Sequence, residues 1–510
     1  MSKPVRVRFA PSPTGPLHIG GVRTALFNYL FAKKHNGTFV LRIEDTDQNR
    51  YVANAEQYIA DALNWSGIPF DEGPQKEGDF GPYRQSERKD IYKKYADQLI
   101  SKGKAYYAFD TAEELDTLRN EYQENKQTFI YNHSNRDNLN NSLSLSTEEV
   151  KNKIENGEKY VVRFKTPTDE ILELKDMIRG DIKIDTNTLD DKILFKSDGM
   201  PTYHLANIVD DHLMEITHVI RGEEWLPSMA LHVLLYRAFG WESPEFAHLP
   251  LILKPTGKGK LSKRDGDKHG FPVFPLEYKN EETNEISRGY REDGYFSDAF
   301  INMLAFLGWN PGTEQEIFSL PELIQAFDIK KVGKAGAKFD VDKTKWFQHQ
   351  YLIKKENEEL AELFLPILKE KVKDSRFHGN DNSYVTKVIS LIKERATFVS
   401  DFWELSDYFF VAPTEYDKKA SKKAWKADTP ELMKGLIEVL RSIDDFSSKN
   451  VESIVKEWIT SKEIGFGKVM QPFRLSLVGA MQGPHLYDIS EMLGKEETIN
   501  RIETAIDKLG

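Results

Sequence analysis

The fold of this chain is decided near its start, where the sequence reads Val5-Arg6-Val7-Arg8-Phe9-Ala10-Pro11-Ser12-Pro13-Thr14-Gly15-Pro16-Leu17-His18-Ile19-Gly20-Gly21. Apolar and basic residues alternate up to Phe9, which predicts a short strand. The proline- and glycine-rich run after it interrupts regular structure. Apolar residues at helical spacing then predict a helix over 19–34, and a second strand is expected over 38–43. This order predicts a strand–helix–strand unit of a parallel sheet.

Length and composition exclude several classes of protein. The chain has 510 residues, enough for about three domains at roughly 150 residues each. A net charge of −11 with 39% hydrophobic residues excludes a wholly disordered or collagen-like chain. The absence of cysteine excludes disulfides, a thiolate nucleophile and Cys-ligated zinc. No apolar run approaches the roughly 18 residues of a membrane helix, and the first residues lack a secretory signal. We therefore expect a cytoplasmic enzyme of several domains, without a membrane partner.

The character of the sequence changes twice along the chain. Charged and loop-forming residues gather at 106–192, so we expect an insertion there between two halves of a parallel sheet. The second half is predicted to begin with a strand at 193–195, because near-continuous apolar runs are typical of strands buried on both faces. From about residue 297 nearly every segment has helical spacing. The fold class is therefore an α/β N-terminal half followed by an all-α C-terminal half.

The loop that ends at Gly21 is a candidate phosphate site. It joins the end of a predicted strand to the start of a predicted helix, where an open α/β sheet binds its ligands and free backbone N–H groups attract phosphate. His18 can donate a hydrogen bond to a phosphoryl oxygen, and Gly20 and Gly21 let a nucleotide approach the backbone. The alternative is a proline-stiffened turn that only caps the helix.

A second candidate is the basic run Lys260-Leu261-Ser262-Lys263-Arg264. A lone basic pentapeptide is usually a solvated surface loop. This one follows the last predicted strand of the second half-sheet, where it would face the same crevice as the first loop. Lysines there can close over a triphosphate and stabilise charge that develops at phosphorus.

The two loops together resemble the His-Ile-Gly-His and Lys-Met-Ser-Lys-Ser signatures of class I aminoacyl-tRNA synthetases. Gly21, Leu261 and Arg264 depart from these signatures, and glycine at the fourth position of the first one resembles the glutamate branch. Five further segments resemble glutamate–tRNA ligases in the expected order along the chain; they are 8–15, 41–47, 81–88, 201–207 and 219–225. The resemblance is dense in the first half, and the second half matches only in length and helical character.

The resemblance implies a glutamate-binding set. Arg8 and Arg221 lie at the ends of predicted strands, and the other members are expected around the bound amino acid. The full set is Arg8, Ala10, Ser12, Glu44, Tyr203, Asn207 and Arg221. Two arginines can hold the two carboxylates of glutamate bidentately, which requires Arg8 and Arg221 to meet in the fold. Glu44 would supply the anion for the substrate ammonium group.

The resemblance also implies an ATP-binding set in and around the two loops. It comprises Pro11, Ser12, Thr14, Gly15, His18, Gly20, Gly21, Glu224, Trp225, Lys260, Leu261, Ser262, Lys263 and Arg264. Three of these, His18, Lys260 and Lys263, are the expected catalytic residues because they would meet the phosphates. No strong general base is needed, since a carboxylate is already a competent nucleophile.

The domains implied by the resemblance are a Rossmann-type catalytic domain and its additions. The first half of the catalytic domain is expected at 1–105, an acceptor-stem-binding insertion at 106–192 and the second half at 193–253. The lysine loop and a stem-contact region would follow at 254–345. A helical anticodon-binding domain would span 346–510.

The implied substrates are L-glutamate, ATP with Mg²⁺, and tRNA(Glu). Glutamate would be joined to the tRNA in two steps through glutamyl adenylate, with release of pyrophosphate and AMP. The sequence leaves open whether tRNA(Gln) is also charged, and we expect a monomer. No zinc or other bound metal is expected. Some family members hold zinc with cysteines in the insertion, and the spacing of His204, His212 and His218 fits no zinc pattern.

Three other functions fit parts of the sequence. A glutaminyl-specific ligase is disfavoured because its C-terminal half is a β-barrel, and a small nucleotidyltransferase would need neither the insertion nor the long C-terminal half. A catalytically dead tRNA-binding paralogue would not be expected to keep the whole set of arginines, lysines and His18.

The segment 270–294 has no assigned role. For the aromatic residues of the helical half we favour core packing over stacking on anticodon bases; they are Trp346, Phe347, Trp403, Phe409, Phe410, Trp425 and Trp458.

Overall fold

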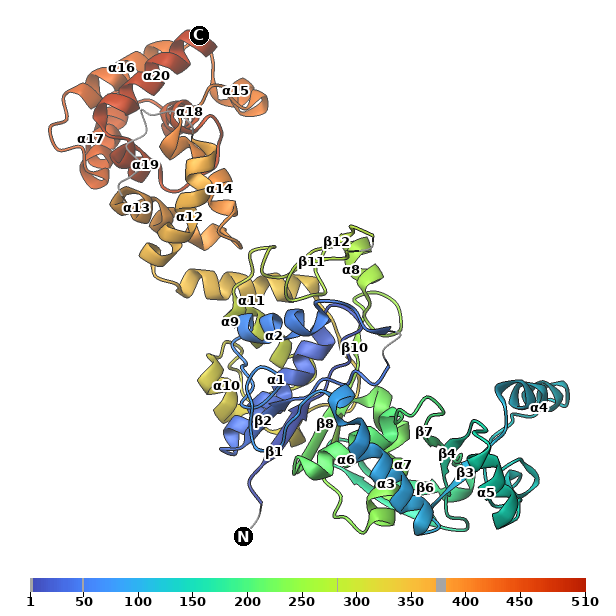
Figure 1. Cartoon of the computed structure of the whole chain (residues 1–510). Coiled ribbons are helices and arrows are strands. Elements are labelled where there is room, and N and C mark those ends of the chain that lie inside the picture. The colour runs from blue at the N-terminus through green and yellow to red at the C-terminus, as the bar shows by residue number, and fades with distance from the viewer. Residues whose placement is uncertain (1–2, 48–49, 282, 373–381) are drawn as a thin grey trace. The chain divides into compact units, whose positions relative to one another are not determined.

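The structure is a computed structural model, and it describes residues 3–47, 50–281, 283–372 and 382–510. The chain forms two compact units, Met1–Thr344 and Lys345–Gly510. Figure 1 shows strands and helices in the first unit and helices in the second. None of the helices within the described ranges has the length and apolar character that a membrane crossing requires.

The first unit begins with the predicted strand–helix–strand unit. Strand β1 (Arg6–Phe9) pairs in parallel with β2 (Thr38–Leu41), and helix α1 (Ile19–Lys34) connects them. The side chain of His18 caps α1, because its Nδ1 accepts a hydrogen bond from the backbone N–H of Gly20 at 3.2 Å. The α/β prediction for this half and the helix over 19–34 are confirmed.

A separate ladder of four strands from later in the chain lies beside β1, and we refer to this ladder together with β1 and β2 as the main sheet. In order across the ladder the four strands are β8 (His218–Gly222), β9 (Glu245–Leu249), β5 (Ile171–Asp176) and β6 (Gly180–Asp185). Strands β8, β9 and β5 run parallel, whereas β6 is antiparallel to β5. The backbone N–H of Thr217 donates to the carbonyl oxygen of Arg6 at 2.9 Å, which places the start of β8 beside β1.

The strand predicted at 193–195 is present, but the prediction that it belongs to the second half of the parallel sheet is wrong. Strand β7 (Ile193–Phe195) pairs antiparallel with β4 (Val161–Phe164), which in turn pairs with β3 (Ala105–Ala108). Conversely, β5 and β6 lie within the expected insertion, yet they extend the main sheet. The reason is physical: Leu194 is fully buried, and an apolar run buried on both faces has the same sequence pattern in either sheet.

The remaining elements of the first unit surround these two sheets. In chain order they are α2 (Ala55–Trp65), α3 (Lys89–Ser101), α4 (Ala112–Glu124), α5 (Thr147–Glu155), α6 (Tyr203–Leu213), α7 (Met229–Phe239), β10 (Ile252–Leu253), α8 (Lys263–His269), β11 (Tyr278–Lys279), β12 (Ile286–Ser287), α9 (Ser297–Ala305), α10 (Leu320–Ala326) and β13 (Ala337–Lys338). Figure 1 shows α4 and α5 with the β3–β4–β7 sheet, away from β1 and β2.

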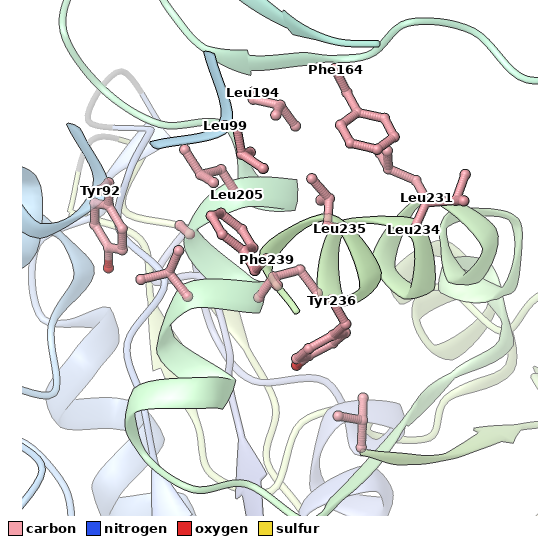
Figure 2. Packing of buried hydrophobic residues seen from close by; sticks show 14 of the residues in the cluster. Tyr92, Leu99, Phe164, Leu194, Leu205, Leu231, Leu234, Leu235, Tyr236 and Phe239 are labelled. Atoms are coloured by element: carbon pink, nitrogen blue, oxygen red, sulfur yellow. The ribbon is translucent and has the colours of Figure 1, made fainter. Parts of the chain in front are cut away.

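One hydrophobic core joins the inserted sheet to the helices of the main sheet. Figure 2 shows Phe164 of β4 and Leu194 of β7 facing Leu231, Leu234 and Leu235 of α7. All five side chains are buried, and residues of α3 and α6 complete the cluster. Apolar burial of this kind is the main favourable term in folding, so this core fixes the insertion on the main sheet.

The second unit is helical throughout its described residues, as predicted. Helix α11 (Val341–Lys354) spans the boundary between the units, and the helices that follow it are α12 (Asn357–Lys371), α13 (Asn382–Ile392), α14 (Asp401–Phe410), α15 (Lys418–Ala424), α16 (Thr429–Arg441), α17 (Ser448–Ser461), α18 (Phe466–Val478), α19 (Leu486–Leu493) and α20 (Lys495–Leu509). Phe347 and Phe409 are buried, and the other five aromatic residues singled out from the sequence are half-buried.

The core shared by α7 and the inserted sheet generates a stability prediction. Leu235 is fully buried, so Leu235→Ala should destabilise the first unit by about 2–5 kcal/mol. Ile171 is 57% exposed, and Ile171→Ala should cost only about 0.5 kcal/mol. Hydrogen exchange of α7 peptides in increasing urea measures both values in the full chain. Equal shifts in the two variants would contradict the packing described for α7.

Candidate active site

A cavity of about 570 Å³ opens where the carboxyl ends of β1 and β8 meet. Most residues singled out from the sequence line it: Arg8, Ala10, Pro11, Ser12, Thr14, His18, Gly20, Gly21, Glu44, Tyr203, Asn207, Arg221, Glu224, Trp225, Lys260 and Leu261. Gly15, Ser262, Lys263 and Arg264 are not among its lining residues. Gly15 shapes the loop instead, since its φ of 144° lies in a region that favours glycine.

His18 lines this cavity and carries one hydrogen-bond donor that no described residue uses. Its Nδ1 accepts the N–H of Gly20, so the neutral ring carries its proton on Nε2. That Nε2 atom is buried and has no hydrogen-bond partner among the described residues. Burial, with a smaller contribution from Lys260, lowers the pKa of His18 from 6.5 to about 4. The neutral ring of His18 therefore contributes fully to the stability of the folded chain above pH 6.5, and this contribution is lost as the pH falls toward 4.

Arg8 is held by a carboxylate that the sequence analysis missed. Its Nε and Nη2 lie 3.0 and 3.3 Å from the two oxygens of Asp211 on α6. The side chain is only 3% exposed, and it lines the cavity. Nη1 and the second N–H of Nη2 remain for a ligand, because a guanidinium has five donors and Asp211 takes two of them. Arg8 can therefore hold an anionic group while staying paired.

Glu44 is held in the same buried network. Arg42, which is fully buried, donates from Nη1 to Asp211 at 2.7 Å and from Nη2 to Glu44 at 3.0 Å. Asn207 donates to the same oxygen of Glu44 at 3.1 Å. Both contacts use Oε1 and leave Oε2 for a ligand. Burial raises the pKa of Glu44, and the nearby Arg42 opposes this shift. Arg42 stands two residues before Glu44 in the segment 41–47, and this short spacing was the available signal for the contact.

Arg221 reaches the cavity from the end of β8. It is 5% exposed, and its Nη1 donates to the hydroxyl of Tyr203 at 3.0 Å. The ring of Tyr203 packs on Trp225, with ring centroids 4.1 Å apart. The structure thus brings Arg8 and Arg221 into one cavity, as their proposed pairing on a dicarboxylate requires. Chain positions 213 residues apart meet because β1 and β8 are neighbours in space.

The lysine loop is only partly inside the cavity. Lys260 lines it, with Nζ 3.3 Å from Oε1 of Glu224. Lys263 begins α8, and its Nζ lies 2.7 Å from Oε1 of Glu285, which precedes β12 in the segment 270–294. Ser262 caps α8 through a reciprocal hydrogen bond with Asp265. Lys263 is therefore outside the cavity lining and paired with Glu285, and its role toward the phosphates stays a prediction.

The histidines considered for zinc are engaged separately. His204 pairs with His232, His212 stacks on Trp241 at 3.7 Å, and His218 contacts Thr217. Across residues 3–47, 50–281, 283–372 and 382–510, no group of three or more histidine and acidic side chains is arranged to hold a metal ion.

Comparisons with known proteins agree with this geometry. The family model described as tRNA synthetases class I (E and Q), catalytic domain, matches residues 4–346, and a model described as an anticodon binding domain matches residues 359–506. The glutamate–tRNA ligase of Flavobacterium psychrophilum is 69% identical over the whole of both chains, and that of Porphyromonas gingivalis strain ATCC 33277 is 56% identical over 100% of this chain and 99% of its own.

Solved structures agree as well. A glutamate–tRNA ligase from Elizabethkingia meningosepticum, crystallised in complex with its amino acid, has a TM-score of 0.95 at 55% identity and covers both chains fully. The glutamate–tRNA synthetase of Elizabethkingia anophelis has a TM-score of 0.92 at 55% identity, over 99% of this chain and 100% of its own. With its two signature loops facing one cavity, and with matches of this extent, the chain belongs to the glutamate–tRNA ligase family of class I tRNA synthetases.

Proposed function

We propose that this chain, as a cytoplasmic monomer, joins L-glutamate to tRNA(Glu) in two steps, of which the first consumes ATP to form glutamyl adenylate. The observation that carries the proposal is one cavity lined by Arg8, Arg221, Glu44 and His18. Two cations and one anion match the charges of glutamate, which carries an α-carboxylate and an ammonium group on one carbon and a second carboxylate at the end of its side chain. The Nε2–H of His18, which has no partner among the described residues, would donate to an anionic phosphate bound in the same cavity.

The glutamate site follows from these charges. One arginine holds each carboxylate, and Oε2 of Glu44 accepts from the substrate ammonium group. Tyr203 and Asn207 hold Arg221 and Glu44 respectively, at 3.0 and 3.1 Å. Glutamine has the same shape as glutamate and lacks the γ-charge, so one arginine would be left buried without its anion. Discrimination between the two amino acids is therefore electrostatic.

ATP binds as its magnesium complex beside the first loop, with Glu224 and Trp225 on the adenosine side. The α-carboxylate of glutamate attacks the α-phosphorus, a new P–O bond forms, and the bond to the β-phosphate breaks to release pyrophosphate. The terminal ribose hydroxyl of the tRNA then attacks the adenylate carbonyl and AMP leaves. Positioning and charge stabilisation carry the first step, with Nε2–H of His18 donating to a phosphoryl oxygen.

The parts of the chain outside the cavity are assigned to the tRNA. The region 106–192 is proposed to receive the acceptor stem, together with the stem-contact region 254–345, and 346–510 to read the anticodon. The match of an anticodon-binding model to residues 359–506 supports the last assignment. The lysine loop is proposed to close over ATP, and this requires Lys263 to leave Glu285.

The proposed function is tested by charging purified tRNA(Glu) and tRNA(Gln) with glutamate and with glutamine in turn. We expect glutamate to be esterified to tRNA(Glu) with ATP consumption, and glutamine to be rejected because it lacks the charge that the paired arginines bind. Radiolabelled amino acid retained on the tRNA is the measurement. Comparable kcat/KM values for glutamine and glutamate would refute the charge-based site. Charging of tRNA(Gln) by glutamate would place the chain among non-discriminating enzymes.

The role of His18 can be separated from its capping of α1. His18→Asn places an oxygen near the Nδ1 position and no donor near Nε2, and asparagine is a good N-cap residue. It should lower kcat by about 10²–10³ with little change in thermal midpoint. His18→Gln places an amide donor near Nε2, so its loss of kcat should be smaller. Glutamate-dependent ATP–pyrophosphate exchange with tRNA present measures kcat. A near-normal rate for His18→Asn would reduce His18 to a helix cap.

Lys263 should affect the rate and hardly affect ATP binding, because it meets the phosphates only after the loop closes. Lys263→Ala should lower kcat by roughly 10²–10³ while the ATP Kd changes only a few-fold. Lys268→Ala removes the same charge from the same helix, where it is exposed, and is the matched control. Pyrophosphate exchange measures the rate and equilibrium binding measures the ATP Kd, and both are determined for each lysine variant. If both lysine variants behave alike, Lys263 has no role in the step.

A further inference from the structure

The guanidinium of Arg221 is enclosed by groups that accept hydrogen bonds. Its Nε donates to Nε2 of His248 at 3.0 Å, and its Nη1 lies 3.2 Å from Nδ1 of His232 and donates to the hydroxyl of Tyr203. Nη2 has a longer contact, 3.4 Å, to the carbonyl of Trp225. An arginine has only donors, so both histidines must offer a lone pair to it. This single requirement fixes the proton positions on the two rings.

His248 must therefore carry its proton on Nδ1, and a carboxylate is there to receive it. Oδ2 of Asp176 lies 2.7 Å from that nitrogen. Oδ1 of Asp176 accepts the backbone N–H groups of Ile178 and Arg179 at 2.9 and 2.8 Å, which fixes the carboxylate itself. Burial opposes the charge on Asp176, but the hydrogen bonds from His248 and the backbone hold its pKa below the ordinary value. Burial lowers the pKa of His248, so the ring is neutral at pH 7.

His232 is fixed in the same way on the other side. Its Nδ1 accepts from Arg221, so its proton is on Nε2, which lies 3.2 Å from Nδ1 of His204. Burial, and next the nearby charge of Arg221, keep the pKa of His232 well below its ordinary value. Two neutral rings thus hold two different nitrogens of one planar group. A planar group fixed at Nε and Nη1 cannot rotate, and Nη2 is the nitrogen that is least engaged.

Topology explains how these residues meet. Asp176 ends β5, and it pairs in parallel register with Phe246 of β9, two residues before His248. Strand β5 comes from the predicted insertion, so the insertion supplies the carboxylate that orients a histidine of the main sheet. His232 comes from α7, which covers that sheet. The side chains of Asp176, His232 and His248 are buried at 2%, 0% and 0% exposure.

We infer that Asp176, His248 and His232 are positioning residues that fix the guanidinium of Arg221 for the substrate carboxylate. This inference rests on the proposed function, in which Arg221 binds glutamate. Asp176 acts through the proton position on His248, and both histidines act through Arg221. Their contribution is specificity for the anionic side chain, because a fixed fork of donors matches a carboxylate bidentately and matches an amide poorly.

Asp176→Asn is the sharpest test because it preserves shape. In the carboxylate, Oδ1 accepts from Ile178 and Arg179, and Oδ2 accepts from the backbone N–H and Nδ1 of His248 at 3.1 and 2.7 Å. An amide has one oxygen, and when this oxygen stays with Ile178 and Arg179 its NH₂ faces His248. The proton of His248 must then move to Nε2, where it opposes the N–H of Arg221. We expect the KM for glutamate to rise about 10- to 100-fold, since misplacement by about 1 Å can cost on the order of 10². The KM for ATP should change less than about threefold by the same reasoning.

A matched control is Asp191→Asn. Asp191 is fully buried, accepts from Tyr106 and Arg136, and lies in the insertion without contact to Arg221. This variant should lower the thermal midpoint and leave the ratio of the two KM values unchanged. His248 provides a second pair, in case Asp176→Asn does not fold. His248→Gln keeps an acceptor near the Nε2 position and should stay near the wild-type KM, whereas His248→Leu should resemble Asp176→Asn.

Arg221→Ala separates failure of this inference from failure of the proposed function. If Arg221→Ala raises the glutamate KM and Asp176→Asn and His248→Leu do not, the positioning role is wrong and the glutamate site stands. If Arg221→Ala also leaves the glutamate KM unchanged, both the role of Arg221 and this inference are overturned, while charging of tRNA(Glu) still tests the overall activity. Equal KM values for His248→Gln and His248→Leu would likewise overturn the inference.

Discussion

The carboxylate of Asp211 is the point on which the site depends. It is 1% exposed and binds two arginines at once, Arg8 at 3.0 Å and Arg42 at 2.7 Å. Burial opposes its charge, but both cations hold the pKa of Asp211 below the ordinary value. Removing one partner from a buried pair leaves an uncompensated charge, which typically costs about 3–5 kcal/mol. Strand β1, the end of β2 and helix α6 carry these three charged groups, so the three elements must pack together in the folded chain.

The two arginines of the cavity are supported in opposite ways. Arg8 faces a carboxylate, whereas Arg221 faces two neutral histidines and a tyrosine hydroxyl. A carboxylate beside Arg221 would neutralise it and compete with the ligand. Neutral acceptors fix the group without reducing its charge. Under the proposed function, this difference suits Arg221 to the side chain of the substrate, where the presence or absence of one charge separates glutamate from glutamine.

Local pattern predicted local structure well and long-range partners poorly. The helix over 19–34 and the loop at its start followed from apolar spacing and a run of prolines, because both signals act within a few residues. The strand at 193–195 was placed in the wrong sheet, since burial on both faces does not specify a partner strand. Asp176 and His248 are 72 residues apart and no local signal links them. The resemblance located the lining of the cavity, and it could not supply the contacts behind that lining.

Lys263 is held much more weakly than the buried arginines of the cavity. Lys263 is paired with Glu285, and both side chains are partly exposed, at 34% and 59%. An exposed ion pair typically contributes about 0–1 kcal/mol, a small fraction of what holds the buried arginines. The substrate phosphates offer several negative charges in place of one carboxylate, so they can draw the lysine away from the β11–β12 segment. In the proposed function, the buried network fixes the place of glutamate, and the weak surface pair of Lys263 with Glu285 allows the lysine loop to close over ATP.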